Sequence, residues 1–176
     1  MKLARQSERL LDQALHLAKR DRFRPEQVNL RRAVSGAYYA LFHALVEVSC
    51  VRLAGPGPRT RAMRRLLART YTHAEMQRAS RAFAQGANGL PPDLRLALAG
   101  SEVSSELREL AQLFHRLQDD RHEADYDLAV QWRRGDVLVQ ITAVGACLEY
   151  LRRERSARDL RTYLTSILVW NRLASR

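Results

Sequence analysis

The residues best suited to chemistry lie in the segment LQDDRHEADYDL, residues 117–128. Five preceding apolar residues recur every three or four positions and so share one helix face: Val103, Leu107, Leu110, Phe114 and Leu117. The next step on this face is Arg121, and Asp125 follows one turn later, where it can pair with the arginine. An arginine on an inward face must be paired or must face a cleft, because an unpaired buried charge is very costly. The pattern predicts either a structural pair or an arginine that Asp125 orients toward an anion in a groove.

A second cluster occupies residues 31–45, with the sequence RRAVSGAYYALFHAL. Small residues keep one flank of the expected helix thin, so that another helix can approach closely: Gly36, Ala37, Ala40 and Ala44. Aromatic residues at helical spacing are typical of a core, and we expect Tyr38 and Phe42 to lie there. Tyr39 and His43, also one turn apart, are candidate binding or orienting residues, with a buried core position as the alternative for His43.

These two segments together resemble the two signatures of HEPN domains. The first is an S-x-A-Y-Y-A-hydrophobic-F-H-A run in the second helix, and the second is an arginine followed by A-D-Y at the end of the third long helix. Their order and separation fit in this chain, and the resemblance covers roughly residues 3–155.

The resemblance implies a helical bundle that forms a homodimer, with the arginine helices of the two subunits meeting at a shared cleft. Many HEPN proteins are metal-independent ribonucleases of toxin–antitoxin or defence systems, and many are encoded beside a small nucleotidyltransferase. For this chain we therefore expect RNA or a nucleotide as ligand, a possible nucleotidyltransferase partner, and neither a metal nor a cofactor.

The chain departs from the family's active motif, in which four to six residues separate the arginine from a following histidine. Residues 126–128 are tyrosine, aspartate and leucine. Metal-free RNA cleavage needs a base for the 2′-hydroxyl and an acid for the leaving oxygen, and tyrosine is a poor base near neutral pH. His122 and His115 are the candidate replacements, although His122 points about 100° away from Arg121 on a helix. Arg121, Tyr126 and His122 are thus the candidate catalytic residues, and cleavage itself is left undecided.

Arginine dominates the charge of the chain. Thirty basic residues against 19 acidic ones give a net charge of +11, and only Lys2 and Lys19 are lysines. Residues 55–98 carry eight arginines and two acidic residues. We expect this segment to contact phosphate, because guanidinium groups match phosphate oxygens, through Arg59, Arg61, Arg64 and Arg65. A solvated face and arginine-favouring codon usage are the alternatives.

The elements that must position these residues are helical. The periodicity predicts helices over roughly 3–20, 25–53, 59–69, 73–85, 101–117 and beyond, 136–151 and 160–170. Thr72 and Asp136 are the expected N-caps, and turn-rich breaks are expected over 55–58 and 86–92. We predict an all-α, up-and-down helical bundle in one domain, residues 1–176. It has a helical insertion at 55–98, between the second and third long helices, and a C-terminal helical extension at 157–176.

Cys50 and Cys147 lie in apolar runs without motif spacing, which indicates buried thiols in a reducing compartment. The N-terminal residues carry charges at short intervals, and no apolar run reaches the 18 residues of a membrane span, so we expect a cytoplasmic protein. The resemblance to HEPN domains implies a protein that binds RNA or a nucleotide and is toxin-like or defence-associated. The alternative is a non-catalytic helical dimer that serves a nucleotidyltransferase or another enzyme.

Overall fold

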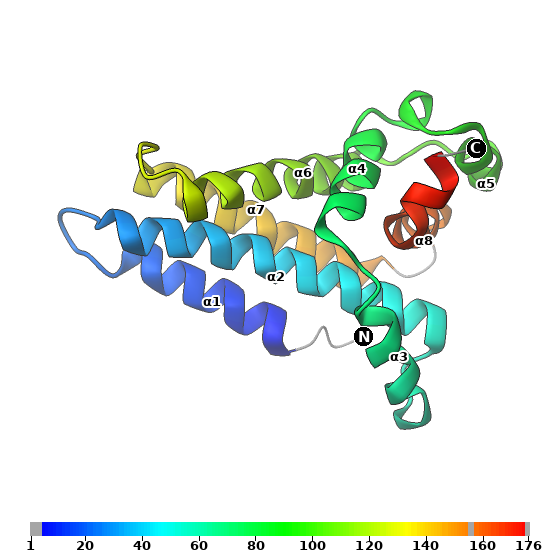
Figure 1. Cartoon of the computed structure of the whole chain (residues 1–176), viewed down its shortest axis with the longest axis horizontal. Helices are drawn as coiled ribbons and strands as arrows, with labels where there is room; N and C mark the ends of the chain where they lie inside the picture. Colours follow the sequence, from blue (N-terminus) through cyan, green and yellow to red (C-terminus); the bar gives the residue numbers. More distant parts are fainter. Residues whose placement is uncertain (1–4, 155–156, 175–176) are drawn as a thin grey trace. The chain divides into compact units, whose positions relative to one another are not determined.

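The computed structural model describes residues 5–154 and 157–174, and within these residues the chain is all-α, as predicted (Figure 1). The elements are α1 (Arg5–Lys19), α2 (Gln27–Ala54), the 3-10 turn η1 (Pro58–Thr60), α3 (Arg61–Ala68), α4 (His73–Ala84), the 3-10 turn η2 (Ala87–Gly89), α5 (Pro92–Leu98), α6 (Ser105–Tyr126), α7 (Arg134–Arg153) and α8 (Arg158–Ala174). The expected helical insertion between the second and third long helices corresponds to the elements from η1 to α5.

Several helix boundaries differ from the sequence prediction. Helix α5 was not predicted, because Pro92 was interpreted as part of a break although proline suits the first turn of a helix. Asp136 was wrongly predicted as an N-cap, since α7 already begins at Arg134. The predicted cap at Thr72 is confirmed by its side chain, which accepts a hydrogen bond from the backbone N–H of Glu75.

The contacts of the described residues fall into two compact units, which we treat separately. Unit 1 comprises Met1–Ala44 and Arg116–Arg153, and unit 2 comprises Leu45–His115 and Glu154–Arg176. Unit 1 contains both segments that the sequence singled out for chemistry, and unit 2 contains the arginine-rich segment 55–98. The predicted organisation as one domain stays a prediction.

Unit 1 is a bundle of four helical segments, from α1, α2, α6 and α7, that lie side by side (Figure 1). Short connections join α1 to α2 and α6 to α7, so each of these pairs runs antiparallel. A specific contact joins every neighbouring pair: Gly36 with Ala14 (α1–α2), Ser35 with Asp125 (α2–α6), Asp120 with Gln140 (α6–α7) and Glu8 with Arg152 (α7–α1). These contacts close the four segments into an up-and-down bundle.

The core of unit 1 is built mainly from the apolar stripes of these helices. Fully buried residues of α2 include Leu30, Val34, Tyr38 and Leu41, and they are joined by Ala14 and Ala18 of α1, Leu117 of α6, and Val137 and Val144 of α7. At Gly36 an added Cβ would lie only 3.2 Å from the Cβ of Ala14, so α1 and α2 are in close contact there. The flank of small residues predicted for the second helix therefore packs closely against α1 at Gly36.

Unit 2 packs α8 against α4 and α5. The buried Tyr163 of α8 shares a 2.8 Å hydrogen bond with Ser80 and makes an edge-on ring contact with Phe83. Asp159 accepts hydrogen bonds from the backbone N–H and the hydroxyl of Ser104, at 2.9 and 2.7 Å, directly before α6. The hydroxyl of Ser104 also accepts a 3.4 Å hydrogen bond from the backbone N–H of Leu107, so Ser104 caps α6, which begins at Ser105 and not near residue 101.

Helix α2 is long and apolar enough to cross a membrane by length and composition, which the sequence analysis did not recognise. Within the fold, 67% of the relevant stretch is buried, and the buried core helix of a protein passes the same test. Cys50 and Cys147 are both free and buried, which confirms their predicted burial.

Candidate functional site

The centre of the candidate site is a contact between α2 and α6 in which the carboxylate of Asp125 binds two side chains. The hydroxyl of Ser35 donates a 2.6 Å hydrogen bond to Oδ1 of Asp125. Nη1 of Arg121 lies 3.6 Å from Oδ2 of the same residue, which confirms the predicted pair one helical turn apart. Ser35 is buried, so this small polar group inside the bundle fixes the carboxylate, and the carboxylate holds the arginine.

The Arg121 side chain is largely covered, with only 14% of its surface exposed. Its guanidinium carbon lies 5.5 Å from the centre of the Tyr38 ring and 6.0 Å from that of the Tyr39 ring, within the range of a cation–π interaction. Burial raises the pKa of Tyr38, whereas the nearby positive charge of Arg121 acts in the opposite direction. Among the described residues, no hydrogen-bond partner reaches the buried Nε of Arg121. The charge is therefore held by one carboxylate and two aromatic rings.

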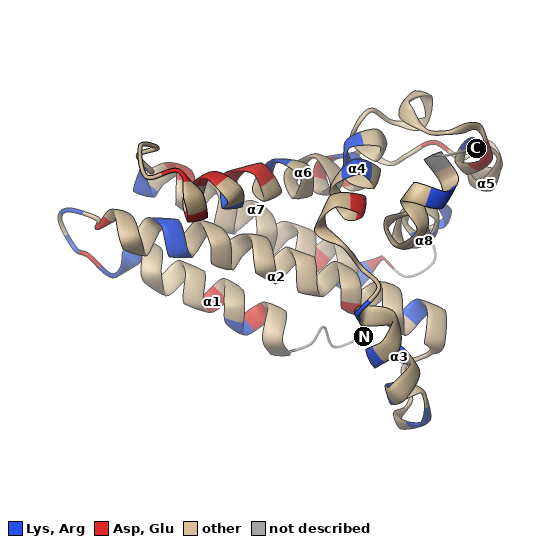
Figure 2. Cartoon of the chain, viewed as in Figure 1, with Lys and Arg blue, Asp and Glu red and all other residues tan. Residues whose placement is uncertain are grey.

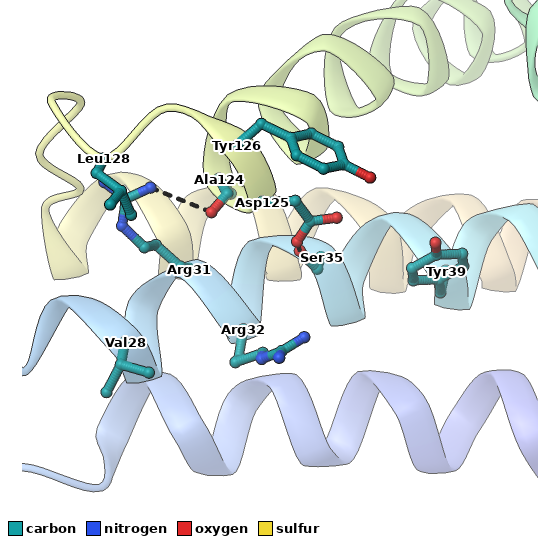
Figure 3. A pocket seen from close by; sticks show the side chains of 9 residues that line it. All are labelled: Val28, Arg31, Arg32, Ser35, Tyr39, Ala124, Asp125, Tyr126 and Leu128. Carbon is teal, nitrogen blue, oxygen red and sulfur yellow. Dashed lines mark hydrogen bonds between the residues drawn. The ribbon is translucent and has the colours of Figure 1, made fainter.

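A cleft of about 430 Å³ opens beside this contact (Figure 3). Its lining comprises Val28, Arg31, Arg32, Ser35, Tyr39, Ala124, Asp125, Tyr126 and Leu128. The cleft thus brings together residues from the two segments that the sequence singled out. Arg121 itself does not line this cleft, and its access from a cleft stays a prediction.

Tyr126 is at the last position of α6 and is 70% exposed. Its ring extends from the end of α6 along the side of the cleft on which Tyr39 lies (Figure 3). The ring of His122 packs against it at a centre-to-centre distance of 4.9 Å, but His122 does not line the cleft. The structure therefore brings Tyr126 to the cleft and leaves His122 on the exposed outer side of the helix.

His43 lies one turn beyond Tyr39 on α2, with the two rings stacked at 6.3 Å. Its side chain is half-buried, it does not line the cleft, and burial lowers its pKa. The half-buried Phe42 ring contacts it edge-on at 5.4 Å. His43 is therefore not fully buried, and its binding or orienting role stays a prediction.

Sequence analysis missed the roles of two adjacent arginines at the start of the α2 signature. The guanidinium of Arg31 donates hydrogen bonds to the backbone carbonyls of Glu123, Ala124, Asp127 and Val130. It therefore caps the end of α6, whose last turn has no basic residue of its own. Arg32 is exposed on the cleft wall, and no described residue gives it a hydrogen bond or an ion pair. The feature of the sequence that could have indicated these roles is the pair of adjacent arginines shortly before Tyr38 and Tyr39 in the same helix.

The end of α6 is strongly acidic (Figure 2). The acidic residues are Asp119, Asp120, Glu123, Asp125 and, just beyond the helix, Asp127. Carboxylates at a helix C-terminus are unfavourable for the helix dipole, and Arg31 and Arg121 partly offset them. Burial and the neighbouring charges of Glu123 and Asp119 raise the pKa of Asp120 to about 6, although Arg116 acts against this rise.

The arginine-rich segment forms a separate surface within unit 2. Arg59, Arg61 and Arg65 are exposed. Arg64 differs, because its Nη1 donates to the carbonyls of Gly55 and Gly57 and to the hydroxyl of Thr60. Arg64 therefore stabilises the turn after α2, and phosphate contact by these four arginines stays a prediction.

No group of three histidine, cysteine, aspartate or glutamate side chains that could hold a metal ion occurs within residues 5–154 and 157–174. Comparison of the chain with models of known families, with curated proteins and with solved structures finds no match.

Proposed function

We propose that this chain is a HEPN-type protein that binds RNA or a nucleotide in the cleft between α2 and α6, as a toxin-like or defence-associated protein. One observation carries the proposal. The two segments that resemble HEPN signatures meet through Ser35, Asp125 and Arg121, directly beside an open cleft. Segments 90 residues apart in the sequence thus contribute to one candidate site.

The cleft offers the groups that a nucleotide requires. Arg32 supplies a cationic fork for phosphate, and a charge-assisted hydrogen bond of this kind is about twice as strong as a neutral one. The rings of Tyr39 and Tyr126 supply faces on which a base can stack. Ser35 and Asp125, joined to each other, form the cleft wall between these groups.

We propose that the main activity of the site is to bind RNA and not to cleave it. Metal-free cleavage requires a general base and a general acid at the reacting phosphate. The cleft is lined by no histidine, and the carboxylate of Asp125 is already engaged by Ser35 and Arg121. These engagements favour a site that holds an RNA strand without hydrolysing it.

We further propose that the protein is a cytoplasmic homodimer. Three apolar side chains at this end of unit 1 are exposed: Phe23 (87%), Val28 (59%) and Leu128 (79%). Their exposure also favours the second candidate function, a non-catalytic dimer that serves a nucleotidyltransferase, because such side chains gather at protein interfaces. Sedimentation at micromolar concentration should give about twice the chain mass of 20.2 kDa, and a strict monomer would exclude a dimeric site.

Incubation with end-labelled single-stranded RNA in EDTA tests the proposed function. We expect a rise in fluorescence anisotropy with intact RNA, and weaker binding by Arg121→Ala once the folded fraction has been measured by a thermal melt. Cleavage that Arg121→Ala abolishes would instead identify a ribonuclease. Absence of both binding and cleavage would leave the interaction-partner function.

A further inference from the structure

A second depression lies on the other side of the same α2 residues. It measures about 480 Å³ and is lined by Gln13, Ala14, Leu17, Arg32, Ser35, Gly36 and Tyr39. Arg32, Ser35 and Tyr39 also line the cleft at α6, so the two hollows share a rim. The two hollows therefore adjoin on α2, one beside α6 and the other beside α1, and we call the pair the trough.

The depression at α1 differs from the cleft in that the described residues that line it include no acidic residue. Leu17 and Gly36 give it apolar surface over the buried Ala14, the exposed Gln13 adds an amide, and Arg32, Ser35 and Tyr39 complete the lining. The close contact between Gly36 and Ala14 holds α1 against α2, so this part of the depression is preformed. Apolar surface beside the amide of Gln13 and the ring of Tyr39 suits a nucleobase, which stacks on its face and forms hydrogen bonds at its edge.

Arg32 is the cation on the shared rim. It is exposed, and within the described chain no acidic side chain or carbonyl engages its guanidinium. By contrast, the neighbouring Arg31 uses its guanidinium to cap α6. A free guanidinium between two hollows is placed to bind the phosphate that links two adjacent nucleosides.

We propose that the ligand is a strand of at least two nucleotides that crosses α2, with one base in each hollow and the linking phosphate on Arg32. This inference rests on the proposed function and narrows it, because a mononucleotide would fill only one of the two hollows. The ring of Tyr39, which lines both, would contact both nucleosides.

The test compares 5′-AMP with the dinucleotide ApA by isothermal titration of the full chain. ApA carries the smaller negative charge, so general attraction to a basic protein favours AMP. We expect ApA to bind about tenfold more tightly, because a second stacked base contributes. Gln13→Glu should lower the affinity for ApA several-fold and leave the affinity for AMP unchanged. Gln112→Glu, the same change at an exposed position of α6 in unit 2, should affect neither ligand.

Equal affinities for AMP and ApA, both unaffected by Gln13→Glu, would overturn the two-nucleotide trough and leave the proposed nucleotide site standing. If neither AMP, ApA nor a longer RNA binds, the proposed function and the trough both fail. Gln13 is exposed, so its isosteric replacement should leave the fold intact, and a thermal melt of each variant checks this.

Discussion

The hydroxyl of Ser35 and the carboxylate of Asp125 are joined by a 2.6 Å hydrogen bond, which links the first half of α2 to the end of α6. The carboxylate is also the partner of Arg121, whose guanidinium lies against two tyrosine rings. Replacement of Ser35, Asp125 or Arg121 should therefore change the position of the other two side chains.

Replacing Arg121 tests how much of its role is structural. Arg121→Ala should lower the free energy of unfolding by about 2 kcal/mol, somewhat less than for a fully buried pair, because the Asp125 side chain is 25% exposed. Arg121→Lys should recover part of this loss by keeping the charge. Urea unfolding measures both variants, and an alanine variant as stable as wild type would show that the pair contributes nothing to the fold.

Tyr126 should matter for binding and not for stability, because its side chain is 70% exposed. Tyr126→Phe should weaken RNA binding by about fivefold, which corresponds to one hydrogen bond of about 1 kcal/mol. Tyr126→Ala should weaken it further by removing the stacking face. Both should unfold at the wild-type urea concentration, and normal RNA affinity in Tyr126→Ala would remove this residue from the site.

The arginines of unit 2 should divide into two groups. Arg64→Ala should lower the free energy of unfolding by about 1 kcal/mol through lost bonds to the turn after α2, whereas the adjacent, exposed Arg65→Ala should change it by less than about 0.5 kcal/mol. If this surface contacts RNA, Arg61→Glu with Arg65→Glu should reduce the salt dependence of binding, by about 0.7 in log–log slope per lost phosphate contact. An unchanged slope would indicate a merely solvated face.

Asp120 should make stability depend on pH. Its pKa is raised to about 6 in the folded chain, so the folded state holds a proton that the unfolded state has lost. The stability from this proton is fully present below about pH 4 and is lost as the pH rises through 6. Asp120→Asn keeps an acceptor for the 2.7 Å hydrogen bond from Gln140 and removes the titration. The variant should therefore gain stability over wild type between pH 4 and 7, and a pH-independent difference would exclude a raised pKa.

Local patterns predicted the helices and the pair of Arg121 with Asp125, because helical periodicity and a spacing of four residues are local properties. Contacts between distant segments could not be predicted in this way. The bond from Ser35 spans 90 residues, and the cap that Arg31 provides spans 92 to 99 residues. For the same reason, the periodicity that placed Arg121 on an inward face could not show that Arg32, and not Arg121, would line the cleft.

The most direct test of the cleft as the RNA site compares two arginine variants that remove the same charge. Arg32→Ala alters the cleft wall, and Arg161→Ala alters an exposed position of α8 in unit 2. With labelled single-stranded RNA at one salt concentration, Arg32→Ala should weaken binding about tenfold or more, as expected for a lost charge-assisted hydrogen bond, and Arg161→Ala by less than about twofold. Equal, small losses in both variants would mean that RNA responds only to the net charge of the chain, and would contradict a site in this cleft.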